Sequence, residues 1–410
     1  MTMSSVQTII GHLDTTRDHR EKLYKHFHQH PELSMQEHAT ADKIRAELDR
    51  LGIPHHTVGG TGVVATIANG EGPVVATRGD TDGLPMQEDS GKEYASTATQ
   101  VDEATGKEVP TAHSCGHDIH IMSLLGALEA LNATKDAWSG TFIAVFQPGE
   151  ETASGARAMV DDGIAELIGT PDVYLGQHVL GTLPLGAVGT RVGPTLSSAF
   201  SVKVTIHGKG SHGSMPELSV DPVVTAASIV GKLQTIVSRE VAAAETAVVT
   251  VGAIHAGSKS NIIPDSAELL INTRAYTDAT GKHLREAIER LVQAECHGAR
   301  CPQEPEFEYY DVYPLTDNDA DTTARVREAF NKYFGDQAMD LAPVPASEDF
   351  SIIADAVGAP YTFWGLGGFE DYEYAPGNHN PAFAPDIQPT LDRGAEAIIV
   401  ASSPWLIGDI

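Results

Sequence analysis

The sequence has 410 residues, and its 56 acidic and 27 basic side chains give a formal net charge of −29 at pH 7. So acidic a chain argues against nucleic acid and anionic membrane surfaces as partners, because both bind patches rich in Lys and Arg. The hydrophobic content of 41% is typical of a globular protein, and the length favours two domains.

Neither a membrane span nor a secretory signal is predicted. No apolar run reaches the roughly eighteen residues that a membrane helix needs, and the N-terminus lacks the basic and apolar regions of a signal peptide. The cysteines, Cys115, Cys296 and Cys301, are few and odd in number, which is typical of a reducing compartment. Cys296 and Cys301 could pair, but we expect free thiols. The predicted location is the cytoplasm.

The first part of the chain predicts helices alternating with short buried strands. Residues 39–51 carry apolar side chains at helical spacing, and Gly52 follows as a typical C-cap. Runs rich in β-branched residues predict strands at 61–68, 73–77, 141–146 and 172–175. A further helix is predicted from one apolar stripe made of Ile121, Leu124, Leu125, Leu128 and Leu131. This alternation indicates an α/β fold with a mostly parallel sheet.

A different pattern begins near residue 192. Alternating apolar and polar residues at 200–206 predict a strand with one wet face, and a helix, two strands, a helix and a strand follow at 222–239, 247–254, 267–275, 282–296 and 307–312. This βαββαβ order is the ferredoxin-like split motif. A strand at 361–365 returns to the first sheet. We therefore predict a catalytic domain at 1–191 and 313–410, interrupted by an inserted domain at 192–312.

The most informative stretch is His113-Ser-Cys115-Gly-His117-Asp118-Ile-His120. Thiolate, imidazole and carboxylate are the donors that zinc and similar divalent metals prefer. A buried thiol beside a helix-capping histidine would explain Cys115 and His117 without a metal. Further donors follow other predicted strands, however, where open α/β sheets place their sites. These donors are Asp80, Asp82, Glu150, Glu151, His178 and His379. Together they predict one shared metal site.

The adjacent acids Glu150 and Glu151 are predicted to have two different roles, metal binding and proton transfer. On many loops such a pair is only solvated charge, but here it follows an apolar strand and the turn Pro148-Gly149. Neighbouring side chains diverge, so one carboxylate can hold metal while the other faces a metal-activated water. That water needs a carboxylate to accept and redeliver its proton.

Two histidine-containing segments have simpler interpretations. His26, His28 and His30 alternate before Pro31 at the expected end of a helix, where residues two apart diverge, so this segment is predicted to be structural. His212 lies in a Gly-rich turn, and by itself it indicates only a solvated turn residue.

Motifs along nearly the whole chain resemble the aminoacylase-like dinuclear metallopeptidase family. The resemblance is greatest to the amidohydrolase branch, which includes hippurate hydrolases and auxin-conjugate hydrolases. It rests on His30-Pro-Glu-Leu-Ser34, Arg78-Gly-Asp-Thr-Asp82-Gly-Leu-Pro85, His113-Ser-Cys-Gly-His-Asp118, Phe146-Gln-Pro-Gly-Glu-Glu151, Gly208-Lys-Gly-Ser-His212, Asp221-Pro222, Asn261-Ile-Ile-Pro264, Ser347-Glu-Asp-Phe350 and His379-Asn-Pro381.

The resemblance implies roles for individual residues. Two divalent metal ions, manganese or zinc, would be bound by Cys115, His117, Glu151, His178 and His379. Glu150 would be the general base and acid. The inserted domain would be a lid that mediates homodimerisation, with His212 steadying the oxyanion in the partner's site, and Asn261 and Arg274 holding the substrate. In related branches a metal-binding histidine stands at the position of Asp80. Here Asp80 would instead support the ligands, together with Asp82 and Asp118.

The predicted function is a metal-dependent amidohydrolase that cleaves N-acyl amino acids, hippurate-like substrates, to a carboxylic acid and a free amino acid. A water activated by two metals would attack the amide, with Glu150 handling the proton. The alternatives are a dipeptidase, an N-acetyl-diaminopimelate-type deacylase or, from another class, a non-catalytic metal-binding protein of the same fold. The presence of Glu150 beside the ligands argues against the last alternative.

Overall fold

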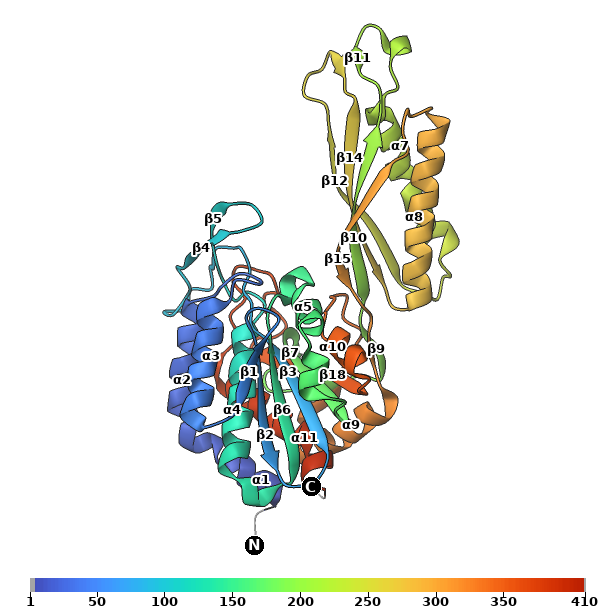
Figure 1. Ribbon diagram of the computed structural model, residues 1–410. Coiled ribbons are helices and arrows are strands. Elements are labelled where there is room, and N and C mark those ends of the chain that lie inside the picture. The colour runs from blue at the N-terminus through green and yellow to red at the C-terminus, as the bar shows by residue number, and fades with distance from the viewer. Residues whose placement is uncertain (1–3, 409–410) are drawn as a thin grey trace. The chain divides into compact units, whose positions relative to one another are not determined.

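The computed structural model describes residues 4–408, which form two compact units (Figure 1). The first unit comprises the described chain up to Thr195, the segment Asp317–Ala342 and the chain from Asp349 onward. The second comprises Leu196–Thr316 and the short segment Pro343–Glu348, whose return to this unit was not expected from the sequence. Within residues 4–408, no helix combines the length and apolar character needed to cross a membrane.

An eight-stranded sheet forms the centre of the first unit. In spatial order its strands are β1 (His55–Val58), β2 (Gly62–Asn69), β6 (Gly140–Gln147), β3 (Val74–Asp80), β7 (Val173–Pro184), β18 (Tyr361–Phe369), β8 (Val188–Thr190) and β17 (Ala338–Asp340). Strands β6, β3, β7 and β18 run parallel, so their carboxyl ends meet at one edge. The predicted α/β fold with a mostly parallel sheet is confirmed. Strand β7 is longer than predicted, and His178 therefore lies within it.

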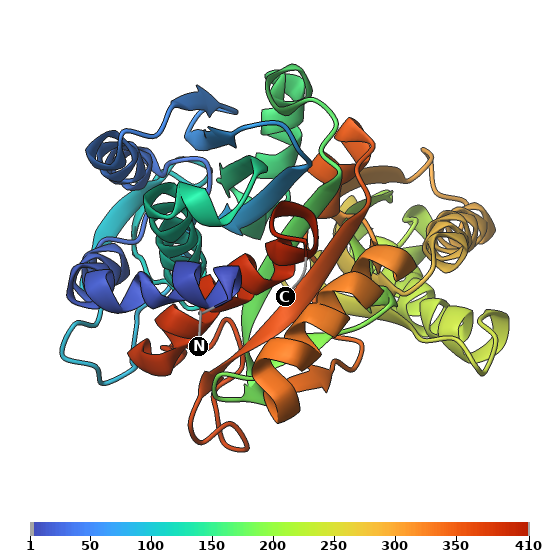
Figure 2. The same cartoon turned by 90° about the horizontal axis from the view of Figure 1, so that it is seen from below.

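Helices cover both faces of this sheet (Figures 1 and 2). One face carries α3 (His38–Leu51), α4 (His117–Ala133), α9 (Ala320–Phe334) and α11 (Ile387–Leu406), with α1 (Ser5–Gly11) and α2 (Leu13–Gln29) packed outside α4. The other carries α5 (Gly155–Asp161), α6 (Ile164–Ile168) and α10 (Ser351–Val357). A small hairpin, β4 (Thr99–Asp102) and β5 (Lys107–Pro110), lies outside the sheet.

Helix α4 differs from its prediction. The sequence indicated one apolar stripe, but every residue from His117 to Leu131 is buried. The reason is that α4 contacts the sheet on one side and α2 and α11 on the others, so no side is left for water. The polar residues at its first turn are therefore buried as well, which matters for the site described below.

The second unit has the predicted βαββαβ order. Its antiparallel sheet contains β12 (Ala247–Ala256), β14 (Ser266–Ala275), β10 (Ser198–His207) and β15 (Glu306–Tyr313) in that spatial order. Helices α7 (Pro222–Thr235) and α8 (Asp278–Gly298) share one core with the inward residues of the sheet, such as Val202 and Leu269. The helix predicted to reach residue 239 ends at Thr235 and continues as a π-helical turn. Two short strands from distant parts of the chain, β11 (Ser211–His212) and β13 (Ile262–Ile263), pair antiparallel in a small sheet of their own.

The net charge of −29 predicts that salt stabilises this protein. Repulsion among carboxylates destabilises the compact state, and counter-ions screen it. We expect the melting temperature to rise as NaCl is raised from about 0.05 M to about 1 M, by roughly 2–4 °C for each kcal/mol of relieved repulsion. Thermal melts over a salt series, compared with a sucrose series, measure this effect. A melting temperature that is flat or falls with salt would contradict it.

Candidate metal centre

The Cys-Gly-His motif is shaped by the glycine between its two donors. Gly116 is the N-cap of α4 and has a φ of 81°, in the left-handed region that favours glycine. A Cβ at this position would collide with the Val179 side chain of β7. Only glycine therefore allows α4 to begin here, with Cys115 on one side of the turn and His117 on the other.

The predicted donors of the first unit come together at the carboxyl edge of the parallel strands. Asp80 is the last residue of β3, and Glu150 and Glu151 begin the turn after β6. His178 lies in β7, and His379 lies in the loop that follows β18. Three sets of these side chains have donor atoms close enough to hold an ion: Asp80, His117, His120 and His178; Cys115, Glu151 and His379; and His117, Glu150 and Glu151.

Cys115 lies among three imidazoles. Its sulfur is 3.4 Å from Nε2 of His178, and it also interacts with His117 and His379. The half-exposed His379 places Nε2 3.1 Å from Oε2 of Glu151. Contacts with the sulfur of Cys115 and with Glu151 raise the pKa of His379 to about 10. In the absence of metal this imidazole therefore carries a proton at neutral pH.

His117 is fully buried, and three carboxylates lie around its Nε2. Its Nδ1 donates to Oδ1 of Asp82 at 3.1 Å. Its Nε2 lies 3.5 Å from Oδ2 of Asp80, 3.8 Å from Oε1 of Glu151 and 4.0 Å from Oε2 of Glu150. Burial opposes charge on this ring, but Asp80 and Cys115 raise the pKa of His117 well above its usual value.

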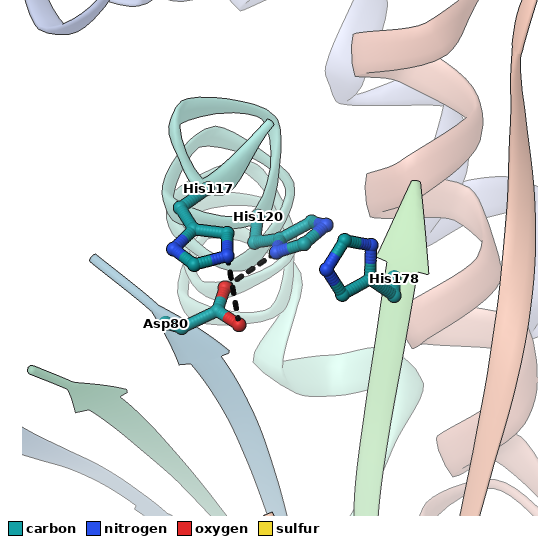
Figure 3. Close-up of side chains that lie close together, drawn as sticks. All are labelled: Asp80, His117, His120 and His178. Carbon is teal, nitrogen blue, oxygen red and sulfur yellow. Dashed lines mark hydrogen bonds and ion pairs between the residues drawn. The ribbon is translucent and has the colours of Figure 1, made fainter. Parts of the chain in front are cut away.

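His120 also belongs to this cluster, where it faces Asp80 (Figure 3). Both of its ring nitrogens are already engaged. The backbone N–H of Val179 donates to Nε2 at 2.9 Å, so the proton must lie on Nδ1, which donates to Oδ1 of Asp80. Burial lowers the pKa of His120, which keeps the ring neutral. His120 therefore positions Asp80 and leaves no nitrogen for a metal.

The two imidazoles that face the cluster have the orientation of metal ligands. Metal-binding histidines almost always donate their other N–H to a carboxylate or a carbonyl. Nδ1 of His117 faces Asp82, and Nδ1 of His178 donates to the Val179 carbonyl at 2.9 Å. In each ring Nε2 is thus the nitrogen that is directed into the cluster. Burial holds the pKa of His178 well below its usual value, so this ring is neutral.

Two buried atoms at the centre show that the residues fit divalent ions. Nε2 of His117 and Oε1 of Glu151 are buried and have no hydrogen-bond partner within residues 4–408. Orphaned buried polar atoms are rare and costly unless an ion or water satisfies them. Together with the neighbouring thiol, imidazoles and carboxylates, they form a donor set typical of zinc or manganese.

Comparison with known proteins identifies the family. A model described as peptidase family M20/M25/M40 matches residues 76–399. The chain belongs to peptidase family M20/M25/M40. The sequence-based assignment to dinuclear metallopeptidases, and to metal-dependent amidohydrolases among them, is thereby confirmed.

Relatives in the M20 family are similar over nearly the full length. The N-acetylcysteine deacetylase of Bacillus subtilis is 34% identical over 385 residues, 92% of either chain. The IAA-amino acid hydrolase ILR1-like 2 of Arabidopsis thaliana is 34% identical, over 88% of this chain and 80% of its own. The crystal structure of Bacillus subtilis YXEP protein, a dinuclear metal binding M20 peptidase, is 28% identical with a TM-score of 0.77, covering 95% of this chain and 98% of that one.

The remaining predicted residues lie in the second unit. His212 is exposed in β11, and its neighbour Gly213 donates to the carbonyl of Asn261 at 2.8 Å, so the structure brings these two residues together. Arg274 is near the far end of β14, where Nη1 donates to Oγ of Ser347 at 2.6 Å. At roughly 3.3 Å per residue, the eight steps from Ser266 to Arg274 span about 26 Å. Arg274 and His212 are therefore far apart within one chain.

Two buried ion pairs of Arg78 in this M20 site were not predicted from the sequence. Oδ2 of Asp80 accepts from Nη1 of Arg78 at 2.6 Å, and Nη2 of Arg78 donates to Asp349 at 3.1 Å. Burial opposes ionisation of Asp80, yet Arg78 and the nearby histidines hold its pKa well below the usual value. Arg78 and Asp349 both lie in quoted motifs, Arg78-Gly-Asp80 and Ser347-Glu-Asp-Phe350, but the 271 residues between them left their contact without a local signal.

The predicted supporting residue Asp118 connects the site to α2. Its Oδ2 accepts from Nδ1 of His28 at 2.6 Å, and Nε2 of His28 donates to Glu88 at 3.0 Å. Burial opposes charge on His28, but Asp118 and Glu88 raise its pKa to about 9. His28 is thus a buried cation between two carboxylates, which fits the structural role predicted for this histidine segment.

Proposed function

We propose that this protein hydrolyses the amide bond of N-acyl amino acids, including hippurate-like substrates, with two divalent metal ions. The observation that carries the proposal is the position of Glu150 beside an unsatisfied ligand set, with its Oε2 4.0 Å from Nε2 of His117. The names of two relatives, a deacetylase of N-acetylcysteine and a hydrolase of IAA-amino acid conjugates, support this substrate class. Release of free amino acid from N-acyl amino acids tests it.

The proposed ligands are Cys115, His117, Glu151, His178 and His379. When bound, two zinc or manganese ions would polarise the amide carbonyl and lower the pKa of water to near neutrality. The two oxygens of Glu151 face different neighbours, since Oε1 is directed toward His117 and Oε2 toward His379. Glu151 would therefore hold metal together with both of these imidazoles. Asp82 orients His117 and also accepts from the backbone N–H of Glu151 at 2.9 Å.

Glu150 is the proposed proton carrier. It accepts a proton from the attacking water and delivers the proton to the nitrogen of the leaving amine, so the carboxylate is regenerated in each cycle. Its side chain is buried, with 7% exposed, and it begins the turn that also carries Glu151. Because Glu151 is the proposed metal ligand of the pair, we assign to the diverging side chain of Glu150 the position that faces the substrate amide.

Arg274 is the proposed partner of the substrate carboxylate, with Asn261 as a further substrate contact. The guanidinium donates to Ser347 and Asn272, and within residues 4–408 no carboxylate lies at ion-pair distance, although its charge opposes the rise in the pKa of Asp311 that burial causes. Its fork of donors matches a carboxylate with two parallel hydrogen bonds. This role favours acylated amino acids over simple amides, which lack the carboxylate.

We also propose a cytoplasmic homodimer formed by the second units. His212, the proposed oxyanion donor, pairs with β13 just before β14 begins, whereas Arg274 lies near the end of β14, so one chain cannot place both on one small substrate. A partner chain could supply the missing His212. Apolar side chains are exposed on α7 (Val223, 43%; Val224, 66%) and on the edge strand β12 (Val248, 41%), which supports an interface there. The cytoplasmic location is supported by three free cysteines.

A charge on the exposed face of α7 should separate the dimer. We expect sedimentation to show a dimer for the wild type and a monomer for Val224→Asp, with hydrolysis reduced at least about 100-fold because the oxyanion donor is absent. Leu167→Asp, on exposed α6 of the first unit, is the matched control and should stay dimeric. A wild type that is fully active as a monomer would contradict the proposal.

A further inference from the structure

The segment Ser34–Glu37 has no assigned role, yet it contacts the turn that carries both functional glutamates. Glu37 precedes α3 as its N-cap residue and is only 1% exposed. Burying a carboxylate is costly unless its oxygens are well satisfied. The hydrogen-bond partners of Glu37 therefore indicate the role of this buried carboxyl group.

Glu37 accepts hydrogen bonds from three places in the chain. Its Oε1 accepts from the backbone N–H of Met35 at 2.9 Å and from that of Gly149 at 2.8 Å. Its Oε2 accepts from the Thr61 hydroxyl at 2.6 Å. Thr61 directly precedes β2, and Gly149 directly precedes Glu150. Glu37 thus joins its own segment, the sheet and the start of the turn that carries Glu150.

The same segment anchors the other end of that turn. The hydroxyl of Ser34 donates to Oδ2 of Asp82 at 2.6 Å, and this oxygen also accepts from the backbone N–H of Glu151. Gly149 has a φ of 58°, and a Cβ on it would come within 2.5 Å of Sδ of Met35. The turn is therefore fixed by carboxylates at Gly149 and at Glu151, and the side chain of Met35 packs against it between them.

We propose that Glu37 is a positioning residue that sets the placement of Glu150 and Glu151 through the backbone of Gly149. The inference rests on the proposed function of these two glutamates. Rate depends steeply on such placement, since a shift of about 1 Å can cost about 100-fold. No other described donor-acceptor pair joins the segment 34–37 to Gly149, so removing the carboxylate breaks this link, while the Gly149 carbonyl still accepts from Ser154 and Gly155.

A glutamine at position 37 should preserve this anchor. Its carbonyl oxygen can take both backbone N–H groups that Oε1 now accepts, and its NH₂ can donate to the Thr61 hydroxyl, which rotates to accept. Alanine at position 37 removes all three hydrogen bonds. The pair Glu37→Gln and Glu37→Ala therefore separates anchoring of the turn from the mere presence of a negative charge.

The experiment compares these two variants in the metal-loaded enzyme, with Glu47→Ala as control. Glu47 is also a buried carboxylate and lies within α3, but it bonds to Arg50 and His19 outside the site. In Glu37→Ala we expect kcat to fall about 100-fold with KM changed less than about threefold. Glu37→Gln should keep kcat within about threefold. Glu47→Ala should lower the melting temperature without lowering kcat.

Hydrogen exchange provides a readout that does not depend on activity. Peptides covering residues 147–153 should take up deuterium faster in Glu37→Ala than in wild type, but not in Glu37→Gln. Unchanged exchange in Glu37→Ala, or equal loss of kcat in both variants, would overturn the inference. A wild type that hydrolyses no amide would defeat the proposed function instead, while the exchange result would still decide whether Glu37 anchors the turn.

Discussion

Replacing Glu150 with glutamine should lower kcat by about 10²–10⁴-fold, the usual contribution of a general base and acid. Glutamine keeps the size and polarity of the side chain but cannot accept a proton from water or return one to the leaving amine. KM should change little, because the carboxylate acts on the transferred proton and does not hold the substrate. Steady-state kinetics on an N-acyl amino acid measure both constants.

Metal content distinguishes Glu150 from its neighbour. Glu150→Gln should still bind two ions per chain, as measured by elemental analysis after dialysis. Glu151→Gln, the matched variant, should lose metal, because Glu151 has one buried oxygen facing His117 and the other at 3.1 Å from His379. If Glu150→Gln loses metal and Glu151→Gln keeps it, the assignment of the acidic pair is reversed.

Removing the metals with a chelator should abolish hydrolysis, and the affinity for added zinc or manganese should rise with pH. In the metal-free protein the pKa of His379 is about 10, raised by Cys115 and Glu151, and that of His117 is raised well above its usual value. Below these pKa values protons compete with the metal, so each displaced proton should strengthen binding up to about tenfold per pH unit. The gain from His379 should end as the pH passes about 10.

Calorimetry tests this proton competition directly. Titrations in buffers with different ionisation enthalpies count the protons released, and a pH series gives the change in affinity. Bound metal should also raise the melting temperature, since a ligand at about 100 times its Kd adds about 2.7 kcal/mol to stability. Affinity that is constant or falls between about pH 6 and 9 would show that these imidazoles are not the groups that the metal displaces.

The fold and the location of the site could be predicted because both are encoded locally. Short β-branched runs alternating with helices indicate a parallel sheet, and donors just after such runs must meet at one edge. The predicted exposure of α4 was wrong because burial depends on distant parts of the chain. Its sequence shows which residues are apolar, but the layer of α2 and α11 that buries the opposite side comes from distant parts of the chain.

The contacts of Glu37 and Arg78 could not be predicted because their partners are far away in sequence. Glu37 and Gly149 are 112 residues apart, and Arg78 and Asp349 are 271 apart. A buried glutamate and a surface glutamate look alike until the fold places them. The role of His120 was equally hidden, since only the Val179 N–H shows that both of its nitrogens are occupied.

The central claim, two-metal hydrolysis of N-acyl amino acids, is tested most directly by assaying metal-loaded protein against a matched panel. The panel should pair N-acetyl, N-benzoyl and longer N-acyl derivatives of several amino acids with the same amides lacking the carboxylate, and with dipeptides. We predict release of free amino acid from N-acyl amino acids with manganese or zinc, much weaker turnover of the amides without a carboxylate, and none after chelation. Complete inactivity toward every acyl group, or equal rates after chelation, would contradict the claim.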